Sequence, residues 1–395
     1  MKRFFFTTIA LAAVAIGCTK SGLIESPQTY EDPISFEPYT GKAPVTKATE
    51  AKTATLQGSG FQVVGYIEAT NSTTINVGEK PYLYRTVNHT ANGWGYTNAA
   101  YWPQDEELTF LAYGLNGAEA FTEETTDYSK LSYTVPPTMA AQKDLVIGKV
   151  IQNRSKAVEG PVQVNFHHVL SRVGFKVTTS GSSAVNATIK NITISGNFVT
   201  GGTFDLTNAV YDDSNNTTAY TAPSDKTYGA SNSTTATSTT YSLFDSDYDA
   251  TVDYTTIDNV NNYPCFVATG NSTQDIYANN SFNPKSNSRA NFTDPTNSTE
   301  TNKDNRFLMI MPQYTTTEGE NPTTTGIDVD IRVIYQLTDA EEQVADFKLT
   351  NFAFMPGKAY EIVFTISTVA VGFNVEVEGW KTDHEHANTT VTPAA

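Results

Sequence analysis

Acidic and histidine side chains gather in two places where a metal ion could bind. Asp383, His384, Glu385 and His386 lie together near the end of the chain. Two histidines two residues apart lie on one side of an extended segment, but the segment supplies no further ligands and no second shell to orient them. We therefore do not expect a built metal site here.

The second place is an acidic stretch with alternating Asp245, Asp247 and Asp249. This spacing is typical of the first positions of a calcium-binding loop. However, Ala250 occupies the turn position that needs glycine, and Thr256 stands where a bidentate glutamate is expected. We interpret the stretch as a solvated acidic loop.

His167 and His168 are adjacent within a predicted strand, so their side chains point to opposite faces and do not chelate one metal together. The chain contains no G-x-S-x-G elbow, no G-x-x-x-x-G-K phosphate loop and no H-E-x-x-H helix. We predict no catalytic residue, no metal and no cofactor.

One residue has a predicted covalent role. Lys2 and Arg3 precede an apolar run from Phe4 to Ile16, which ends in Gly17 and Cys18. The run is too short to cross a bilayer as a helix, which takes roughly 20 residues, so residues 1–17 are interpreted as a cleaved signal peptide.

Ala15 to Cys18 resemble the lipobox of bacterial lipoproteins, in which the cysteine is acylated and becomes the first residue after cleavage. More than one acyl chain on Cys18 suffices for stable anchoring. The expected location of the precursor is the outer membrane, through this lipid. An ordinary secretory peptide is the alternative. Cys265 then has no disulfide partner, and its apolar neighbours favour a small buried side chain over a reactive thiol.

The composition excludes several partners. A net charge of −17 argues against nucleic acid, whose phosphates require lysine and arginine, and against electrostatic docking on anionic lipid. The length without the leader favours two domains, at about 100 to 200 residues each.

Residues 18–47 are predicted to form a tether with one short edge strand. Prolines punctuate the segment, and Ile34 and Phe36 are an apolar pair between two of them. Proline is tolerated at the edges and ends of sheets, which suits such a strand.

The dominant period from Phe61 onward is two, which predicts half-buried antiparallel strands packed as sheets. The alternating apolar runs are Phe61 to Ile67, Leu108 to Ala112, Val162 to Phe166, Val173 to Val177, Ile327 to Leu337, Tyr360 to Ile366 and Phe373 to Val377. Residues 210–305 are instead rich in Asn, Thr, Ser and Asp, and we interpret most of them as long surface loops in the second domain.

Several segments together resemble the fimbrillin family of Bacteroidetes, the subunits of pili that assemble by donor-strand exchange. The similar segments are Tyr101-Trp102-Pro103, Leu108 to Tyr113, Lys143 to Gly148, Val164 to Val173, Ile192 to Gly196, Gly202 to Leu206, Leu308 to Gln313, Pro356 to Tyr360 and Val375 to Trp380. The resemblance implies an all-β fold of two tandem β-sandwich-like, transthyretin-like domains with long loops, at residues 48–170 and 171–395.

The resemblance also implies an assembly route. A trypsin-like protease would cut between Lys47 and Ala48, or second at Lys42, and remove a strand whose apolar plugs are Ile34 and Phe36. The emptied groove would accept a strand from another fimbrial subunit, so self-polymerisation and a surface fimbria that supports adhesion are expected.

The donor would be C-terminal, either residues 373–377 or the tail at residues 388–392. One alternative is an anchor subunit that keeps its lipid and its first strand. Another is a monomeric surface lipoprotein that binds a glycan through Trp94 and Tyr96, although partly buried aromatic residues are the simpler interpretation of these two. The surface ligand is left open, and an enzyme is the weakest option.

Overall fold

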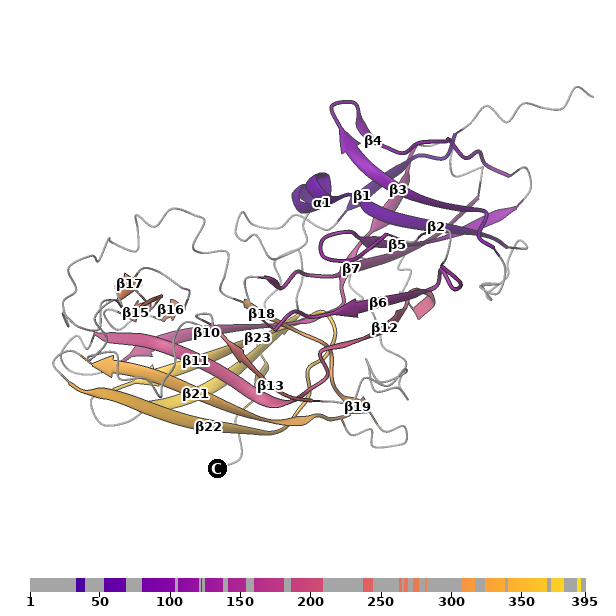
Figure 1. Cartoon of the computed structure of the whole chain (residues 1–395). Helices are drawn as coiled ribbons and strands as arrows, with labels where there is room; N and C mark the ends of the chain where they lie inside the picture. Colours follow the sequence, from indigo (N-terminus) through magenta and orange to yellow (C-terminus); the bar gives the residue numbers. More distant parts are fainter. Residues whose placement is uncertain are drawn as a thin grey trace, which may run out of the picture.

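The computed structural model of the chain is mainly β, as expected, with strands forming two lobes (Figure 1). The residues that the structure describes are 33–39, 53–68, 80–103, 106–120, 122, 125–137, 141–153, 160–180, 186–208, 237–243, 263–264, 266–268, 273–276, 281–282, 307–316, 324–337, 340–367, 371–379 and 389–391. Within these residues, no helix has the length and apolar character needed to span a membrane.

The N-terminal lobe contains a six-stranded sheet in the order β4-β3-β2-β5-β7-β9. Its strands are β2 (Phe61–Glu68), β3 (Leu83–Thr90), β4 (Gly93–Gly95), β5 (Glu107–Gly114), β7 (Val146–Asn153) and β9 (His167–His168). The helix α1 (Thr53–Ser59) leads into β2. All ladders in this sheet are antiparallel.

The two central strands of this sheet are buried on both faces, which the sequence did not predict. Val63 of β2 and Phe110 of β5 face one apolar cluster, whereas Val64 and Tyr113 face the other. The prediction of half-buried strands was wrong for β2 and β5 because each face of the sheet is covered by another layer.

One of these layers consists of β1 (Phe36–Tyr39) and β8 (Val162–Asn165), which pair in parallel. Together with the facing side of the six-stranded sheet they enclose a separate core built from residues between Ile34 and Phe166. This small sandwich contains the candidate site.

The C-terminal lobe packs two sheets face to face. One has the order β16-β10-β23-β24-β25, with β18 also paired to β10, and the other β13-β11-β21-β22, with β15 also paired to β11. The strands of the first sheet are β10 (Ser171–Thr179), β16 (Gln274–Asp275), β18 (Phe307–Ile310), β23 (Lys358–Ile366), β24 (Val371–Gly379) and β25 (Thr389–Val391). Those of the second are β11 (Ala187–Phe198), β13 (Thr237–Ser242), β15 (Phe266–Ala268), β21 (Ile327–Leu337) and β22 (Glu342–Phe352).

The alternation predicted for residues 327–337 is confirmed in β21 as far as Val333, but it breaks at Ile334, which is also buried. Val329 and Ile331 are buried, whereas Asp328 and Arg332 point to solvent. On this outer face Arg332 binds Asp346 of β22 through two hydrogen bonds, from Nε at 2.7 Å and from Nη2 at 3.1 Å. The outer edge strand β22 thus carries charges that discourage further strand addition.

A two-stranded ladder joins the lobes, formed by β6 (Lys130–Thr134) and β12 (Gly201–Asp205). The short helix η2 (Leu206–Asn208) follows β12. The remaining short strands are β14 (Tyr263–Pro264), β17 (Ser281–Phe282), β19 (Thr315–Thr316) and β20 (Thr324–Thr325).

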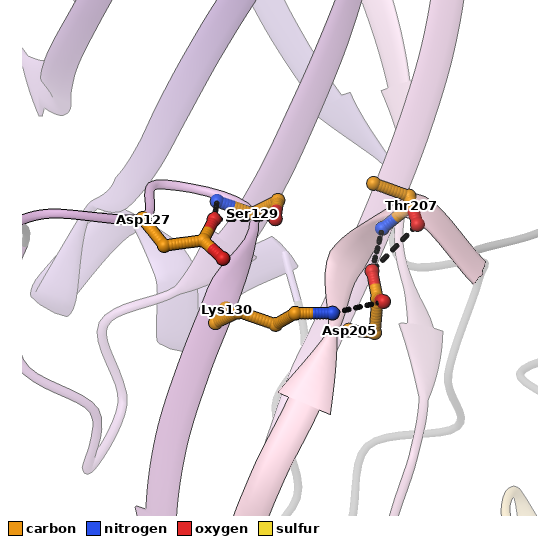
Figure 2. Close-up of polar contacts among 5 residues, drawn as sticks. All are labelled: Asp127, Ser129, Lys130, Asp205 and Thr207. Carbon is orange, nitrogen blue, oxygen red and sulfur yellow. Dashed lines mark hydrogen bonds and ion pairs between the residues drawn. The ribbon is translucent and has the colours of Figure 1, made fainter. Parts of the chain in front are cut away.

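Carboxylates fasten the end of this ladder (Figure 2). Asp127 accepts hydrogen bonds from the backbone N–H and the hydroxyl of Ser129 at 2.9 and 2.5 Å. On the paired strand, Asp205 forms an ion pair with Lys130 and accepts from the backbone N–H of Thr207 at 3.0 Å. Each carboxylate satisfies a turn locally, and Lys130 ties the two strands together.

Candidate functional site: the groove that holds the first strand

The first strand lies in a groove of the N-terminal lobe and alternates in exposure. Ile34 and Phe36 are 2% and 3% exposed, whereas Ser35 and Glu37 between and after them face solvent. Full burial of each apolar side chain is worth about 1.5 to 3 kcal/mol, so the pair contributes about 3 to 6 kcal/mol to holding the strand. The two predicted plug residues therefore point into the core.

Aromatic rings form the bottom of the groove. The ring of Phe36 meets Phe61 of β2 and Phe110 of β5 edge to face, with centroids 6.5 and 5.2 Å apart. The ring of Tyr96 forms one side of the groove, with its centroid 5.9 Å from that of Phe36. Such contacts add about 0.5 to 1.5 kcal/mol per pair beyond burial, and they would be exposed to water if the strand left.

Backbone pairing holds the strand on both edges. On one side β1 pairs with β8 over four residues, from Phe36 opposite Val162 to Tyr39 opposite Asn165. The Val162 N–H also donates to the Ser35 carbonyl at 2.8 Å. Among the described strands, β8 has a ladder only with β1, so departure of β1 would leave a row of unpaired backbone groups.

On the other edge, Tyr96 and Ala100 form hydrogen bonds with Ile34 at the start of the strand. The Ile34 N–H donates to the Ala100 carbonyl at 2.8 Å, and the Tyr96 hydroxyl donates to the Ile34 carbonyl at 2.6 Å. An isolated bridge joins Pro33 to Tyr101. Burial raises the pKa of Tyr96, so its hydroxyl keeps its proton at neutral pH and remains a donor.

A glycine sets the position of β8 above the sheet. A Cβ atom on Gly148 of β7 would lie 2.7 Å from the Asn165 carbonyl oxygen and 3.0 Å from a methyl of Val164. Only a residue without a side chain lets β8 approach β7 this closely, and this approach fixes the width of the groove.

Trp94 and Tyr96, the residues of the glycan alternative, contribute their rings to this lobe. Trp94 packs on Phe61 at 5.5 Å and on His89 at 5.0 Å, and Tyr96 packs on Phe36. Both rings are partly buried against the core that contains the first strand.

The two adjacent histidines point to opposite sides, as predicted. His168 is buried and its Nδ1 lies 2.6 Å from Oδ2 of the buried Asp144, whereas His167 is half-buried. In the part of the chain that the structure describes, no three His, Cys, Asp or Glu side chains gather into a metal site.

Other predicted residues lie outside the described residues. They are Cys18, Lys42, Lys47, Ala48, Asp245, Asp247, Asp249, Cys265 and residues 383–386. The acylation and cleavage positions therefore remain predictions.

At the C-terminal end, the two candidate donor segments differ in their pairing. β24, which contains residues 373–377, lies between β23 and β25 in its sheet. β25 pairs with β24 over three residues, and the described strands include no partner on its other edge. Of the two, β25 is the segment whose loss disturbs less of the sheet.

Sequence reasoning missed two parts of the groove. The parallel pairing of β1 with β8 joins residues more than 120 positions apart, and no local pattern signals it. The Tyr96 hydroxyl bond to Ile34 was also missed, although a tyrosine beside a core aromatic commonly places its hydroxyl on a polar partner.

Comparisons with known proteins agree with this architecture. A family model described as Fimbrillin-like matches residues 46–293, more than half of the chain. Fimbrium subunit Fim1C of Phocaeicola vulgatus is 26% identical over 177 residues, which is 40% of this chain and 46% of the relative. The match thus spans a little under half the length of that relative.

Among solved structures, a fimbrial protein from Bacteroides vulgatus shares the fold. The TM-score is 0.54 and the identity 18%, with 88% of this chain and 99% of the other covered. The chain therefore belongs to the fimbrillin-like family, a family of structural proteins and not of enzymes.

Proposed function

We propose that the chain is a structural subunit of a surface fimbria that polymerises by exchange of its first strand. The observation that carries this proposal is the placement of β1, an apolar plug that completes a core otherwise built from later residues. An incoming strand with the same alternation would satisfy both the pockets of Ile34 and Phe36 and the free edge of β8.

Release of the strand would follow cleavage between β1 and α1. The segment from residue 40 to residue 52 joins the two elements and contains Lys42 and Lys47. A cut between Lys47 and Ala48 removes β1 but leaves α1 and the whole six-stranded sheet in the product. The remaining chain keeps every wall of the groove and loses only its occupant.

The proposed donor is the C-terminal tail around β25. A donor must leave its own sheet at small cost, and β25 is bonded to one described neighbour over three residues. The segment 373–377 would have to break ladders on both sides, with Ile362 of β23 and Val391 of β25 among the partners of Val375. This difference in pairing favours the tail.

Export is proposed to begin with acylation of Cys18, which tethers the precursor to the outer membrane until cleavage releases it. An anchor subunit is the second form of this proposal. In such a subunit β1 stays in its groove, and Cys18 keeps the base of the fibre on the membrane.

The N-terminal residue of the surface protein separates these forms. Mass spectrometry of the protein sheared from intact cells should find a free Ala48, and a Lys47→Gln plus Lys42→Gln variant should accumulate as acylated precursor. A control variant, Lys348→Gln, alters an exposed lysine of β22 and should mature normally. Acylated Cys18 on every molecule, with fimbriae still present, would exclude the polymerising subunit and favour the anchor.

A further inference from the structure

A polar recess of about 700 Å³ lies on the N-terminal lobe beside β3 and β4. Its walls come from residues 84–86, 88 and 90 of β3, from Gln62 of β2, and from residues 95–98 at the end of β4 and after it. The residues that matter for its chemistry are Tyr84, Arg85, Asn88, Gly95 and Asn98. Tyr96 also lines the recess and is shared with the strand-exchange groove, whereas these five residues do not contact the first strand in any hydrogen bond or ring contact described above.

The charge of the recess is opposite to that of the protein. Its lining contains one guanidinium, that of Arg85, and no carboxylate. The whole chain carries a net charge of −17. A single cation among amides and hydroxyls favours a ligand with one anionic group on an otherwise neutral, hydrogen-bonding body.

The recess is held in shape by bonds to the backbone. Arg85 donates from Nε to the Asn98 carbonyl at 3.2 Å and from Nη1 to the Tyr84 carbonyl at 2.7 Å. Asn98 has a φ of 59°, in the left-handed region that non-glycine residues seldom adopt. Strained residues of this kind concentrate at binding sites, where the surrounding structure fixes them.

The remaining lining suits sugar hydroxyls. Thr86 donates to the buried Gln62 amide oxygen at 3.2 Å, while Asn88 and Thr90 present polar side chains at the surface of β3. Tyr84, which also lines the recess, packs its ring against Tyr128 at 5.0 Å. The volume matches that of small-ligand sites, which hold roughly 300 to 1,000 Å³.

From this arrangement we propose that the recess binds an acidic oligosaccharide, with Arg85 receiving its carboxylate or sulfate and the amides and hydroxyls of β3 receiving its sugar hydroxyls. One guanidinium is too little for a polyphosphate or a nucleic acid, and the polar lining does not suit an apolar ligand. The chain of residues 19–395 keeps its first strand, so binding to the recess is tested separately from polymerisation.

Gly95 offers a way to fill the recess without disturbing the fold. A Cβ atom placed on Gly95 meets no atom within 4 Å, and the same holds for the exposed Gly372 of β24 in the other lobe. Gly95→Trp therefore blocks the recess, and Gly372→Trp is its matched control. Arg85→Gln removes the charge, with Arg332→Gln as the control on an exposed arginine.

The test applies the soluble chain of residues 19–395 to an array of neutral, sialylated and sulfated oligosaccharides, followed by calorimetry with the best-bound glycan. We expect binding to acidic glycans, with the sialylated and sulfated arms showing which anion is preferred. Arg85→Gln and Gly95→Trp should each weaken binding at least about tenfold, as loss of a charge-assisted bond does, while both controls bind normally. Absence of binding, preference for neutral glycans, or binding that survives Gly95→Trp would each overturn the proposal.

Discussion

The hydroxyl of Tyr96 donates a hydrogen bond to the carbonyl oxygen of Ile34 across 2.6 Å, and so links the loop after β4 to the first strand. The same hydroxyl accepts from the Ala100 N–H at 3.4 Å, and Ala100 in turn accepts from the Ile34 N–H. The residue Ile34, just before β1, is therefore held by a closed set of bonds that does not involve β8.

Tyr96→Phe should loosen this end of the strand. The loss of one hydrogen bond to a buried carbonyl costs about 1 kcal/mol, so exchange of the Ile34 and Val162 amide protons should accelerate about fivefold. Tyr335→Phe removes a comparable hydroxyl bond, to Gln343 in the C-terminal lobe, and should leave those two amides unchanged. Equal exchange in both variants would show that Tyr96 does not hold β1.

Phe36→Ala should release the strand more strongly. Truncation of a buried phenylalanine costs about 3 to 5 kcal/mol, and because β1 is a terminal segment the cost should appear as local release before global unfolding. Hydrogen exchange at Val162 should rise about a hundredfold or more. Glu37→Ala, on the exposed side of the same strand, should have little effect, and similar exchange for the two variants would contradict the plug interpretation.

Gly148→Ala tests the close approach of β7 and β8. The added methyl would meet the Asn165 carbonyl at 2.7 Å, so β8 must shift, at a cost of about 1 to 3 kcal/mol. Urea unfolding should show the loss, whereas Gly372→Ala, where the methyl meets no atom within 4 Å, should unfold at nearly the same concentration as the parent. A parent-like midpoint for Gly148→Ala would mean that β8 is not fixed by β7.

Glu68, at the end of β2, should make stability depend on pH. It is 4% exposed, and neither carboxylate oxygen has a hydrogen-bond partner among the described residues. Burial raises the pKa of Glu68, and Thr109 and Lys149 offset this in part. An acid with a raised pKa in the folded state is ionised first in the unfolded chain, so the folded protein loses stability as pH rises from about 4 toward the folded-state value.

Glu68→Gln should therefore stabilise the protein at pH 7 but not at pH 4. Asp205→Asn should have the opposite effect on stability and destabilise the protein at pH 7. Burial alone would raise the pKa of Asp205, but Lys130 and Thr207 bring it below the usual value, so its contribution is present above about pH 4 and is lost as pH falls further. Thermal unfolding at pH 3, 4, 5 and 7 measures both, and parallel curves for the two variants would refute this assignment.

The sequence predicted those features that depend on local pattern. The alternation in residues 327–333 identified β21 because Asp328 and Arg332 mark its wet face. The apolar pair Ile34 and Phe36 identified the first strand because prolines limit it to a sheet edge.

The features that the sequence did not predict depend on distant contacts. The sequence of β5 shows no clear alternation because the strand is buried on both faces. Phe110 packs into the core on one face, and Leu111 packs into the core on the other. The sequence also did not identify β8 as the partner of β1, because Val162 and Val164 show the same period-two pattern whether they pair with β1 or with any other strand. The recess around Arg85 is formed where the chain after β4 folds back on β3, and no sequence motif predicts it.

Polymerisation as proposed requires that a strand of another molecule can replace the first strand. The most direct measurement compares chains 19–395 and 48–395 by light scattering and electron microscopy, with a peptide of residues 31–41 added to the shorter chain. The shorter chain should form polymers, and the peptide should suppress them while an Ile34→Asp, Phe36→Asp peptide does not. A shorter chain that remains monomeric in every condition, or polymers that ignore the native peptide, would contradict the account.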